Sequence, residues 1–290
     1  MELKLNYMMV KFKEKYYKKR CAILCGHMVR GINNINPQSD YIVSLTSYGE
    51  RLKTVWMTIQ SIFDQNCKFS KVILWVAYQD MSQINDQLRM LECHGLTIRY
   101  CKDIHSYKKL IYTVKEYSNY NLITVDDDVI YSERYFIKLI KLHKKYPECI
   151  CCYRAHTMRF REGLMLPYKE WDFHSLGIKG PTMKILPVGI GGILYPAFSF
   201  SVKDFDFDVI KKIAPYSDDL YFKWLEIKKG INVVKVYRNK KHIPYYIANT
   251  QENSLKMLNI IDGNNNDVAI KNIENYYGDT FYNMISKKFR

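Results

Sequence analysis

Short apolar runs alternate with amphipathic stretches along the chain between residue 41 and residue 145. Four runs, at 41–45, 71–77, 96–100 and 121–125, have the length and composition of buried strands. Each is followed by a segment whose apolar residues recur at helical spacing. This alternation predicts an α/β fold with a mostly parallel central sheet, flanked by helices on both faces. Ligands bind such sheets at the carboxyl ends of the strands.

The second half of the chain is less regular. We expect a helix from Ser132 to about Lys145, a strand at 149–153, and a last clear helix that Ser217 caps and Gly230 closes. Between them, residues 154–200 are rich in glycine and proline and favour irregular structure. The tail from residue 245 is polar. The pattern divides the chain into an N-terminal segment (1–40), a main domain (41–240) and a C-terminal extension (241–290).

Charge adds a preference for anionic partners. The chain carries 44 Lys and Arg against 29 Asp and Glu, a net charge of +15, which suits nucleic acid, an acidic membrane face or a phosphorylated ligand. The basic residues are dispersed and form no recognised nucleic-acid-binding motif, so we expect no nucleic-acid partner. Residues 1–40 have the pattern of a basic amphipathic helical segment. Such a helix either lies on an anionic membrane or packs on its own domain.

The chain has no apolar run long enough to cross a bilayer and no secretory signal pattern. We therefore expect a cytoplasmic protein. If the N-terminal segment binds a membrane, the contact is peripheral, on the inner face of the plasma membrane.

Three consecutive carboxylates end the fourth apolar run. Because side chains alternate along a strand, we expect Asp126 and Asp128 on one side and Asp127 on the other. Two carboxylates on one side repel each other, and a hard cation such as Mn²⁺ or Mg²⁺ resolves this while it fills its remaining positions with phosphate oxygens and water. The arrangement therefore indicates a phosphorylated ligand. The alternative is an acidic, solvated turn.

Two further features carry candidate chemistry. Asp218 and Asp219 begin a helix, where they serve either the helix dipole or general base catalysis on an attacking hydroxyl. Glycines in the segment 189–196 let the backbone approach a ligand closely, and Trp171 and Tyr195 are available to stack on a sugar ring. The alternative for the glycines is a tight turn. The pattern matches neither a P-loop nor a dinucleotide-binding motif.

Five blocks in this order resemble bacterial GT-A fold glycosyltransferases, in particular family 2-like enzymes encoded with capsule and O-antigen polysaccharide genes. The resemblance covers residues 41–240, about 70% of the chain. The blocks are Ile42-Val-Ser-Leu-Thr-Ser-Tyr-Gly-Glu-Arg51, Ser106-Tyr-Lys-Lys-Leu110, Ile123-Thr-Val-Asp-Asp-Asp-Val-Ile-Tyr131, Leu186-Pro-Val-Gly-Ile-Gly-Gly-Ile-Leu-Tyr-Pro196 and Ser217-Asp-Asp-Leu-Tyr-Phe222.

The resemblance implies a GT-A fold with a nucleotide-sugar half (41–131) and an acceptor half (132–240). Asp128 would bind the metal directly and Asp126 the ribose or metal-bound water, with Asp127 between them in the donor site. His242 falls where some members place a third metal ligand, although its spacing equally suits a surface or core histidine. The remaining donor-site matches are Thr46, Ser47 and Arg51 beside the nucleotide, Asp103 at the base, and Lys108 or Lys109 near the diphosphate.

On the acceptor side, the resemblance places Gly191 and Gly192 in the acceptor loop and makes Asp218 or Asp219 the base of an inverting enzyme. It thus implies a metal-dependent inverting transferase that moves a sugar from a nucleotide-diphosphate donor to a saccharide or a lipid-linked saccharide. UDP is the nucleotide favoured by family frequency. Two other classes remain open, a sugar-nucleotide pyrophosphorylase and a basic nucleic-acid-binding protein.

Overall fold

A computed structural model describes Met8, Lys11, Phe12, residues 14–16, 35–237, 239–241, 245–247, Thr250 and 265–288. Most of the expected N-terminal segment, as well as His242, therefore lies outside the described residues. No helix among the described residues is both long and apolar enough to span a bilayer.

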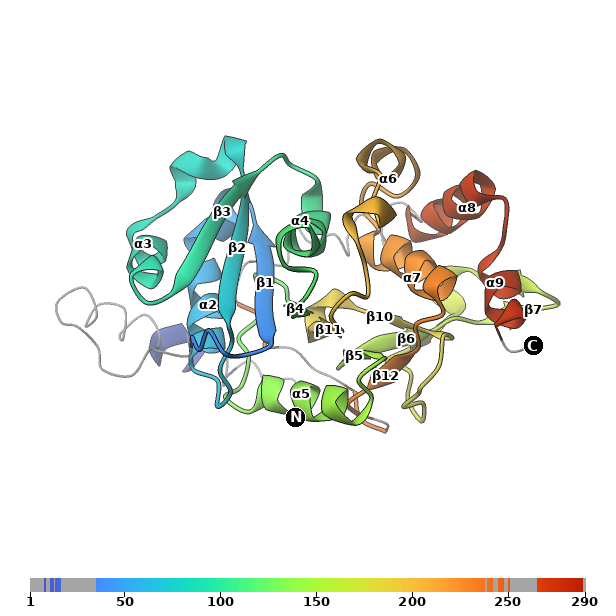
Figure 1. The fold of residues 1–290 in the computed structure, drawn as a ribbon, viewed down its shortest axis with the longest axis horizontal. Helices are drawn as coiled ribbons and strands as arrows, with labels where there is room; N and C mark the ends of the chain where they lie inside the picture. The colour runs from blue at the N-terminus through green and yellow to red at the C-terminus, as the bar shows by residue number, and fades with distance from the viewer. Residues whose placement is uncertain are drawn as a thin grey trace.

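A seven-stranded sheet forms the centre of the molecule (Figure 1). Its strand order is β12-β5-β11-β4-β1-β2-β3, and every neighbouring pair is parallel except the two that β11 forms with β4 and β5. This confirms the expected α/β fold with a mostly parallel sheet. The strands are β1 (Tyr41–Ser47), β2 (Lys71–Ala77), β3 (Leu96–Cys101), β4 (Asn121–Thr124), β5 (Ile150–Cys152), β11 (Ile193–Tyr195) and β12 (Val233–Lys235).

Alternation along the strands gives the sheet two apolar faces. Ile42 and Ile73 face one buried cluster, and their neighbours Val43 and Leu74 face the other. The first cluster includes residues of α4, α6, α7, α8 and α9, and the second includes residues of α2, α3 and α5. The helices are α2 (Val55–Phe63), α3 (Asp86–Glu92), α4 (Lys108–Tyr117), α5 (Tyr135–Lys145), α6 (Phe207–Ile213), α7 (Asp218–Lys229), α8 (Asn265–Tyr277) and α9 (Phe281–Lys287).

Helix α7 is buried along most of its length, and the two C-terminal helices cover it. Trp224 stacks on Tyr277 of α8 at a centroid distance of 5.3 Å and meets Phe281 of α9 edge-on at 5.0 Å. The expectation that α7 is the last clear helix is therefore wrong. Residues 265–287 are mostly polar, yet Ile270 and Ile273 lie at helical spacing and are buried.

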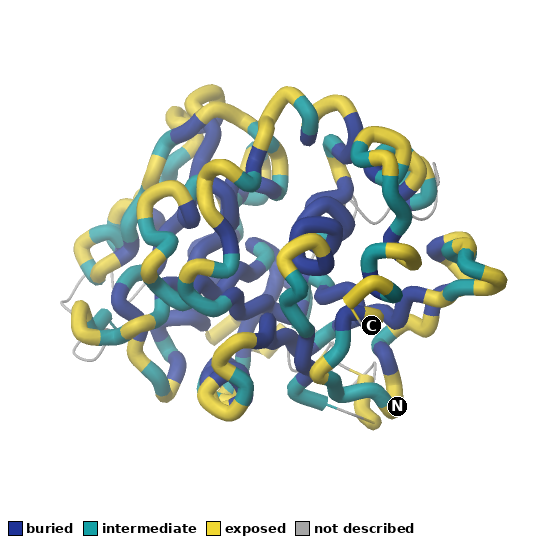
Figure 2. The backbone as a smooth tube through the Cα atoms, turned by 45° about the vertical axis from the view of Figure 1, so that its right-hand side comes forward, coloured by how far each residue is buried: buried dark blue, intermediate teal, exposed yellow. Residues whose placement is uncertain are grey.

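The stretch between residues 154 and 200 contains short strands and turns, as its composition predicted. An antiparallel sheet has the order β10-β6-β9, and β7 pairs with β8. These strands are β6 (Ala155–Thr157), β7 (Phe160–Arg161), β8 (Leu164–Met165), β9 (Asp172–Phe173) and β10 (Ile185–Pro187). Buried residues run through the middle of the molecule and exposed residues occupy its rim (Figure 2).

Candidate active site

A cavity of about 650 Å³ opens where the carboxyl ends of β1 and β4 meet the first turn of α7. Residues from 41–131 and from 132–240 contribute to its walls, as do Tyr246 and Asn266. Ten residues that the sequence analysis singled out line it: Thr46, Arg51, Asp103, Lys108, Lys109, Asp126, Asp127, Asp128, Asp218 and Asp219. Ser47 lies just behind the wall, where its hydroxyl donates to Asp127 Oδ2 at 2.6 Å.

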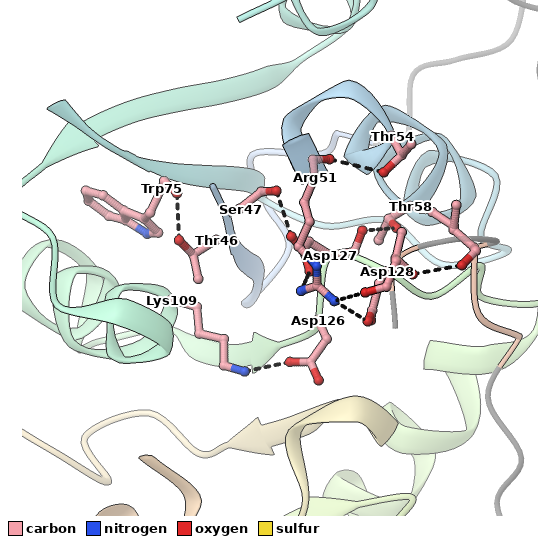
Figure 3. A network of polar contacts seen from close by, with 12 residues as sticks. Thr46, Ser47, Arg51, Thr54, Thr58, Trp75, Lys109, Asp126, Asp127 and Asp128 are labelled. Atoms are coloured by element: carbon pink, nitrogen blue, oxygen red, sulfur yellow. Dashed lines mark hydrogen bonds and ion pairs between the residues drawn. The ribbon is translucent and has the colours of Figure 1, made fainter. Parts of the chain in front are cut away.

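The three consecutive aspartates do not alternate as expected. Strand β4 ends at Thr124, so the aspartates lie in the turn beyond it and strand geometry does not govern their side chains. Arg51 donates from Nη1 to Asp127 and from Nη2 to Asp128, each at 2.6 Å. Asp126 extends in another direction, to Lys109 (Figure 3). The pairing is thus Asp127 with Asp128, and the expected pairing of Asp126 with Asp128 on one side is wrong.

Asp127 holds this turn in place from inside the protein. Its two carboxylate oxygens accept from Ser47 and Arg51, and its backbone carbonyl accepts from the Thr58 hydroxyl at 2.8 Å. Burial raises the pKa of Asp127, although the Arg51 guanidinium opposes this effect. Because Ser47 and Arg51 occupy both of its carboxylate oxygens, Asp127 positions Arg51 and the turn.

Lys109 lies between the two acidic groups of the cavity. Its Nζ is 2.7 Å from Asp126 Oδ1 and 3.8 Å from Asp218 Oδ2. Burial alone would lower the pKa of Lys109, but the carboxylates of Asp126, Asp218 and Asp219 raise it above its ordinary value. The side chain is therefore a permanent cation that joins the end of β4 to the start of α7.

Asp218 and Asp219 occupy the first turn of α7. The backbone N–H of Gly189 donates to Asp219 Oδ2 at 3.3 Å. Burial raises the pKa of both carboxyls, and the pKa of Asp219 lies well above its ordinary value because Asp218 adds its negative charge. Ser217 holds the N-cap position, but its hydroxyl donates to Asn266 Oδ1 and accepts no hydrogen bond from the N–H groups of the helix.

Gly189 lies in the narrow gap between Asp126, in the turn after β4, and Asp219, in the first turn of α7. A Cβ on this residue would lie 3.0 Å from Lys109 Nζ, 3.2 Å from Asp126 Oδ1 and 3.6 Å from Asp219 Oδ1. The hydrogen of Gly189 therefore leaves room at the point where Asp126, Lys109 and Asp219 come together. We infer that a group bound here contacts both acidic clusters.

Asp103 follows β3 and lies at another edge of the cavity. It accepts from Lys108 Nζ at 2.5 Å, from the His105 backbone N–H at 3.0 Å and from Gln79 Nε2 at 3.2 Å. Burial acts to raise the pKa of Asp103, but the bond from Lys108 outweighs it and the pKa is lowered. Lys108 thus pairs with Asp103, whereas Lys109 faces Asp126. Thr46 also lines the cavity, and its hydroxyl donates to the Trp75 carbonyl at 2.8 Å.

Four residues expected at the acceptor site do not line the cavity. Trp171 and Tyr195 are only 3% and 2% exposed and belong to the apolar core, and Trp171 Nε1 donates to the Leu166 carbonyl. A Cβ on Gly191 would lie 2.9 Å from the backbone nitrogen of Arg154, so this glycine permits close backbone packing. Gly192 has a φ of +75°, which glycine adopts without strain.

A wall of the cavity that the sequence analysis missed faces these acidic groups. We call it the Arg154 wall, and it consists of Arg154, His156, Tyr168, Phe173, His174 and Tyr246. Arg154 lies two residues after the end of β5, so its place just beyond a buried strand was a usable signal. The histidines and Phe173 come from the irregular stretch, where sequence pattern gives no such signal.

The carboxylates of Asp126 and Asp128 are hard oxygen donors that suit Mn²⁺ or Mg²⁺. Among the described residues, no cluster of three or more His, Cys, Asp or Glu side chains could hold a metal ion. Two carboxylates still fit these ions, which are commonly bound by one or two carboxylates together with phosphate oxygens and water. The side chain of Asp126 is 29% exposed and lines the cavity, so it is accessible to such an ion.

Comparison with known proteins gives little guidance. No protein-family model and no curated protein matches the chain. Among solved structures, the mannosyltransferase PcManGT from Pyrobaculum calidifontis in complex with GDP-Man and Mn2+ is similar over 80% of this chain, with 10% identity and a TM-score of 0.43. The similar region spans 64% of that structure's length. A likeness this distant carries no argument about fold or chemistry.

Proposed function

We propose that this protein is a metal-dependent glycosyltransferase that takes a sugar from a nucleotide-diphosphate donor. One observation carries the proposal: a single cavity brings the acidic turn after β4, the cation Lys109 and the carboxylates of Asp218 and Asp219 together around Gly189. Glycosyl transfer needs a site for a diphosphate next to a base, and these groups supply both within one cavity.

The donor side of the proposed site consists of Asp126, Asp128, Arg51 and Lys109. Asp126, the more exposed carboxylate of the two, would hold Mn²⁺ or Mg²⁺ together with phosphate oxygens and water, and Asp128 would join it only when its carboxylate leaves Arg51. When bound, the ion supplies Lewis-acid stabilisation of the negative charge on the leaving diphosphate. Lys109 adds a fixed positive charge at the same place, next to Asp126. Arg51 keeps the turn in position through Asp127 and Asp128. Asp103 and Thr46 line the same cavity, and we assign them to the base and ribose of the nucleotide.

Asp219 is the proposed general base. It takes a proton from the acceptor hydroxyl while that oxygen forms a bond to the anomeric carbon and the bond from that carbon to the diphosphate breaks. A raised pKa strengthens a carboxylate as a base, and Asp219 has the more strongly raised pKa of the two. Asp218 lies closer to Lys109 and is 8% exposed, so we assign it the role of holding Lys109. Attack opposite the leaving group inverts the anomeric configuration.

We further propose a UDP-sugar as the donor, a saccharide or lipid-linked saccharide as the acceptor, and surface polysaccharide synthesis as the setting. These assignments rest on the resemblance of the five sequence blocks to capsule and O-antigen enzymes. The basic segment 1–40 would bring the protein to an anionic membrane that carries a lipid-linked acceptor.

Isothermal titration with UDP and GDP, each with Mn²⁺, Mg²⁺ or EDTA, tests the proposal. We expect one nucleotide diphosphate to bind with metal and to bind at least tenfold more weakly with EDTA. A panel of nucleotide sugars, followed by release of the nucleotide diphosphate, then identifies the donor. If no nucleotide diphosphate binds under any of these conditions, the proposal is wrong.

A further inference from the structure

Arg154 differs from the other cations of the cavity in its pairing. Three basic side chains that line the cavity form ion pairs with carboxylates: Arg51 with Asp127 and Asp128, Lys108 with Asp103, and Lys109 with Asp126. No carboxylate among residues 35–237 and the other described positions forms an ion pair with Arg154. A guanidinium inside a cavity is costly to desolvate unless a ligand or water compensates for the loss.

Two polar atoms of the Arg154 wall are buried without a hydrogen-bond partner in the described part of the chain. They are Nε of Arg154 and Nδ1 of His174. Buried polar groups in folded proteins are nearly always bonded, so each exception calls for an explanation. Both residues line the same cavity. Nε of Arg51, on the donor side of the cavity, is in the same state, so these atoms mark the cavity as a ligand site, and the missing ion pair of Arg154 singles out this wall.

The backbone of the wall is held in an uncommon conformation. His174 has a φ of +70° and Ser175 a φ of +45°, in the left-handed region. Lys235, which is 1% exposed, donates to the carbonyl oxygens of both residues. The His174 backbone N–H donates to Nδ1 of His156 at 3.1 Å. Strained backbone that the surrounding structure fixes in this way is frequent at ligand sites.

The two histidines of the wall are neutral. Burial, together with the nearby charge of Arg154, lowers the pKa of His156 to about 3 and that of His174 to about 4. Because Nδ1 of His156 accepts the His174 N–H, the neutral ring carries its proton on Nε2 and is a donor there. Arg154 has only donors. The wall therefore offers hydrogen-bond donors and one positive charge.

We propose that the Arg154 wall binds an anionic group, a carboxylate or a phosphate, on the acceptor saccharide. A guanidinium recognises both groups through paired hydrogen bonds, and the neutral histidine donors complete the site. This inference deepens the proposed function, because it assigns the wall to the acceptor. It predicts that the natural acceptor is acidic.

The placement of Tyr168 connects this wall to the proposed base. Its hydroxyl lies within electrostatic reach of both Asp219 and Arg154, and its ring lies 6.0 Å from that of His156. A saccharide whose anionic group contacts Arg154 would therefore extend across Tyr168 toward Asp219. The donor side has its own cations on other elements, namely Arg51 on the 3-10 helix η1 (Gly49–Lys53) and Lys109 on α4, so the diphosphate does not need Arg154.

Histidine side-chain NMR on the full chain tests the proposal with three probes: glucuronic acid for the carboxylate, glucose 6-phosphate for the phosphate, and glucose as the neutral match. We expect at least one anionic probe to shift the His174 and His156 resonances in a saturable manner, and glucose at the same concentrations to leave them unchanged. Which probe binds more tightly identifies the acidic group. If neither anionic probe shifts these resonances, or if glucose does so equally, the proposal is wrong.

Arg154→Gln, Arg154→Lys and a matched control complete the test. Arg159→Gln is the control, because Arg159 is 54% exposed and does not line the cavity. We expect Arg154→Gln to weaken binding of the anionic probe at least tenfold, Arg154→Lys to weaken it less, and Arg159→Gln to leave it unchanged. Melting curves of all three establish that they fold. Unchanged binding in a folded Arg154→Gln variant would refute the proposal.

The two proposals fail separately. Binding of UDP or GDP with metal depends on Arg51, Lys109 and the aspartates, and Arg154→Gln should leave it unchanged. If the nucleotide fails to bind while the anionic probe binds through Arg154, the transferase proposal fails and the anion site stands. If the nucleotide binds and no acidic saccharide is preferred, the anion site fails and the transferase proposal stands.

Discussion

The donor side and the Arg154 wall face the same cavity but satisfy their charges differently. On the donor side, Arg51, Lys108 and Lys109 all pair with carboxylates, so the charges are balanced within the protein. On the Arg154 wall, Arg154 forms no ion pair with a described carboxylate, although a buried nitrogen without a hydrogen-bond partner occurs on both sides, at Nε of Arg51 and at Nε of Arg154. A ligand that binds on the donor side must compete with ion pairs inside the protein. A ligand that binds on the Arg154 wall displaces no ion pair.

The backbones of the two sides differ in the same way. The donor side lies mainly at the ends of strands of the central sheet, although His105, which also lines the cavity, has a φ of +53°. The Arg154 wall depends on short strands and on positive φ values at His174 and Ser175. The comparison teaches that a site can be preorganised by internal charge pairs on one side and by a constrained backbone on the other.

Substitution of Asp219, which lies between the donor side and the Arg154 wall, should have the largest effect on activity. Asp219→Asn removes the proposed base while it keeps the shape of the side chain, and we expect turnover to fall by about 10²–10⁴-fold. Binding of the nucleotide diphosphate should remain within about threefold. Single-turnover kinetics and titration measure the two effects. Asp208→Asn on α6 is the control, since Asp208 is exposed and outside the cavity. Full activity in Asp219→Asn would remove Asp219 from the mechanism.

The internal ion pairs of the donor side predict a large cost when Arg51 is removed. Arg51→Gln leaves Asp127 and Asp128 without their guanidinium, and these side chains are only 4% and 7% exposed. Removal of one partner from a buried pair typically costs about 3–5 kcal/mol. Urea unfolding measures the change. Arg89→Gln breaks an exposed pair with Glu92 and should cost at most about 0.5 kcal/mol. Equal losses of stability in the two variants would contradict the expected difference between a buried and an exposed ion pair.

The pH dependence of activity should reveal the raised pKa of Asp219. Burial is the largest cause and the charge of Asp218 adds to it, so the carboxyl ionises at a higher pH than an ordinary aspartate. Catalysis needs the ionised form, and kcat/KM should therefore rise with pH through this higher pKa. Steady-state kinetics across the acidic range measure this rising limb of the pH profile of kcat/KM. A limb at about pH 4, the ordinary aspartate range, would contradict the prediction.

A smaller effect concerns stability. Because the pKa of Asp219 is higher in the folded state, the fold favours the protonated form and stability falls as pH rises between the unfolded and folded values. Asp219→Asn removes this loss. We expect the melting temperature of the variant to exceed that of the wild type by about 2 °C at neutral pH and to match it below pH 4. Melting curves at both pH values measure the difference, and an excess that persists at low pH would point to another cause.

The regular half of the molecule could be predicted from its sequence. The apolar runs gave the four parallel strands, and the end of the fourth run gave Asp126 as a ligand-site residue, whereas Asp103 and Arg51 came from the resemblance of the sequence blocks. The ion-pair partner of each charged side chain could not be predicted from the sequence. Arg51 contacts aspartates 76 and 77 residues away, and only the assembled sheet brings them together.

The irregular half needed tertiary information. Trp171 and Tyr195 lie near glycines and prolines, a pattern that fits a sugar platform and a buried core equally well, and burial assigns them to the core. The helices α8 and α9 escaped prediction because half of their residues are polar, and their buried apolar residues belong to a core that they share with α7. His174 owes its place in the cavity to a backbone conformation that sequence pattern does not specify.

Lys235 has a consequence for how this protein could change its substrate. Its buried ammonium anchors the main-chain oxygens of His174 and Ser175, and any movement of that loop would leave a charge stranded away from water. The main chain there is consequently fixed, whereas Nε of Arg154 and Nδ1 of His174 have no hydrogen-bond partner in the described part of the chain. Exchange of those two side chains offers a route to new acceptor preferences on an unaltered scaffold.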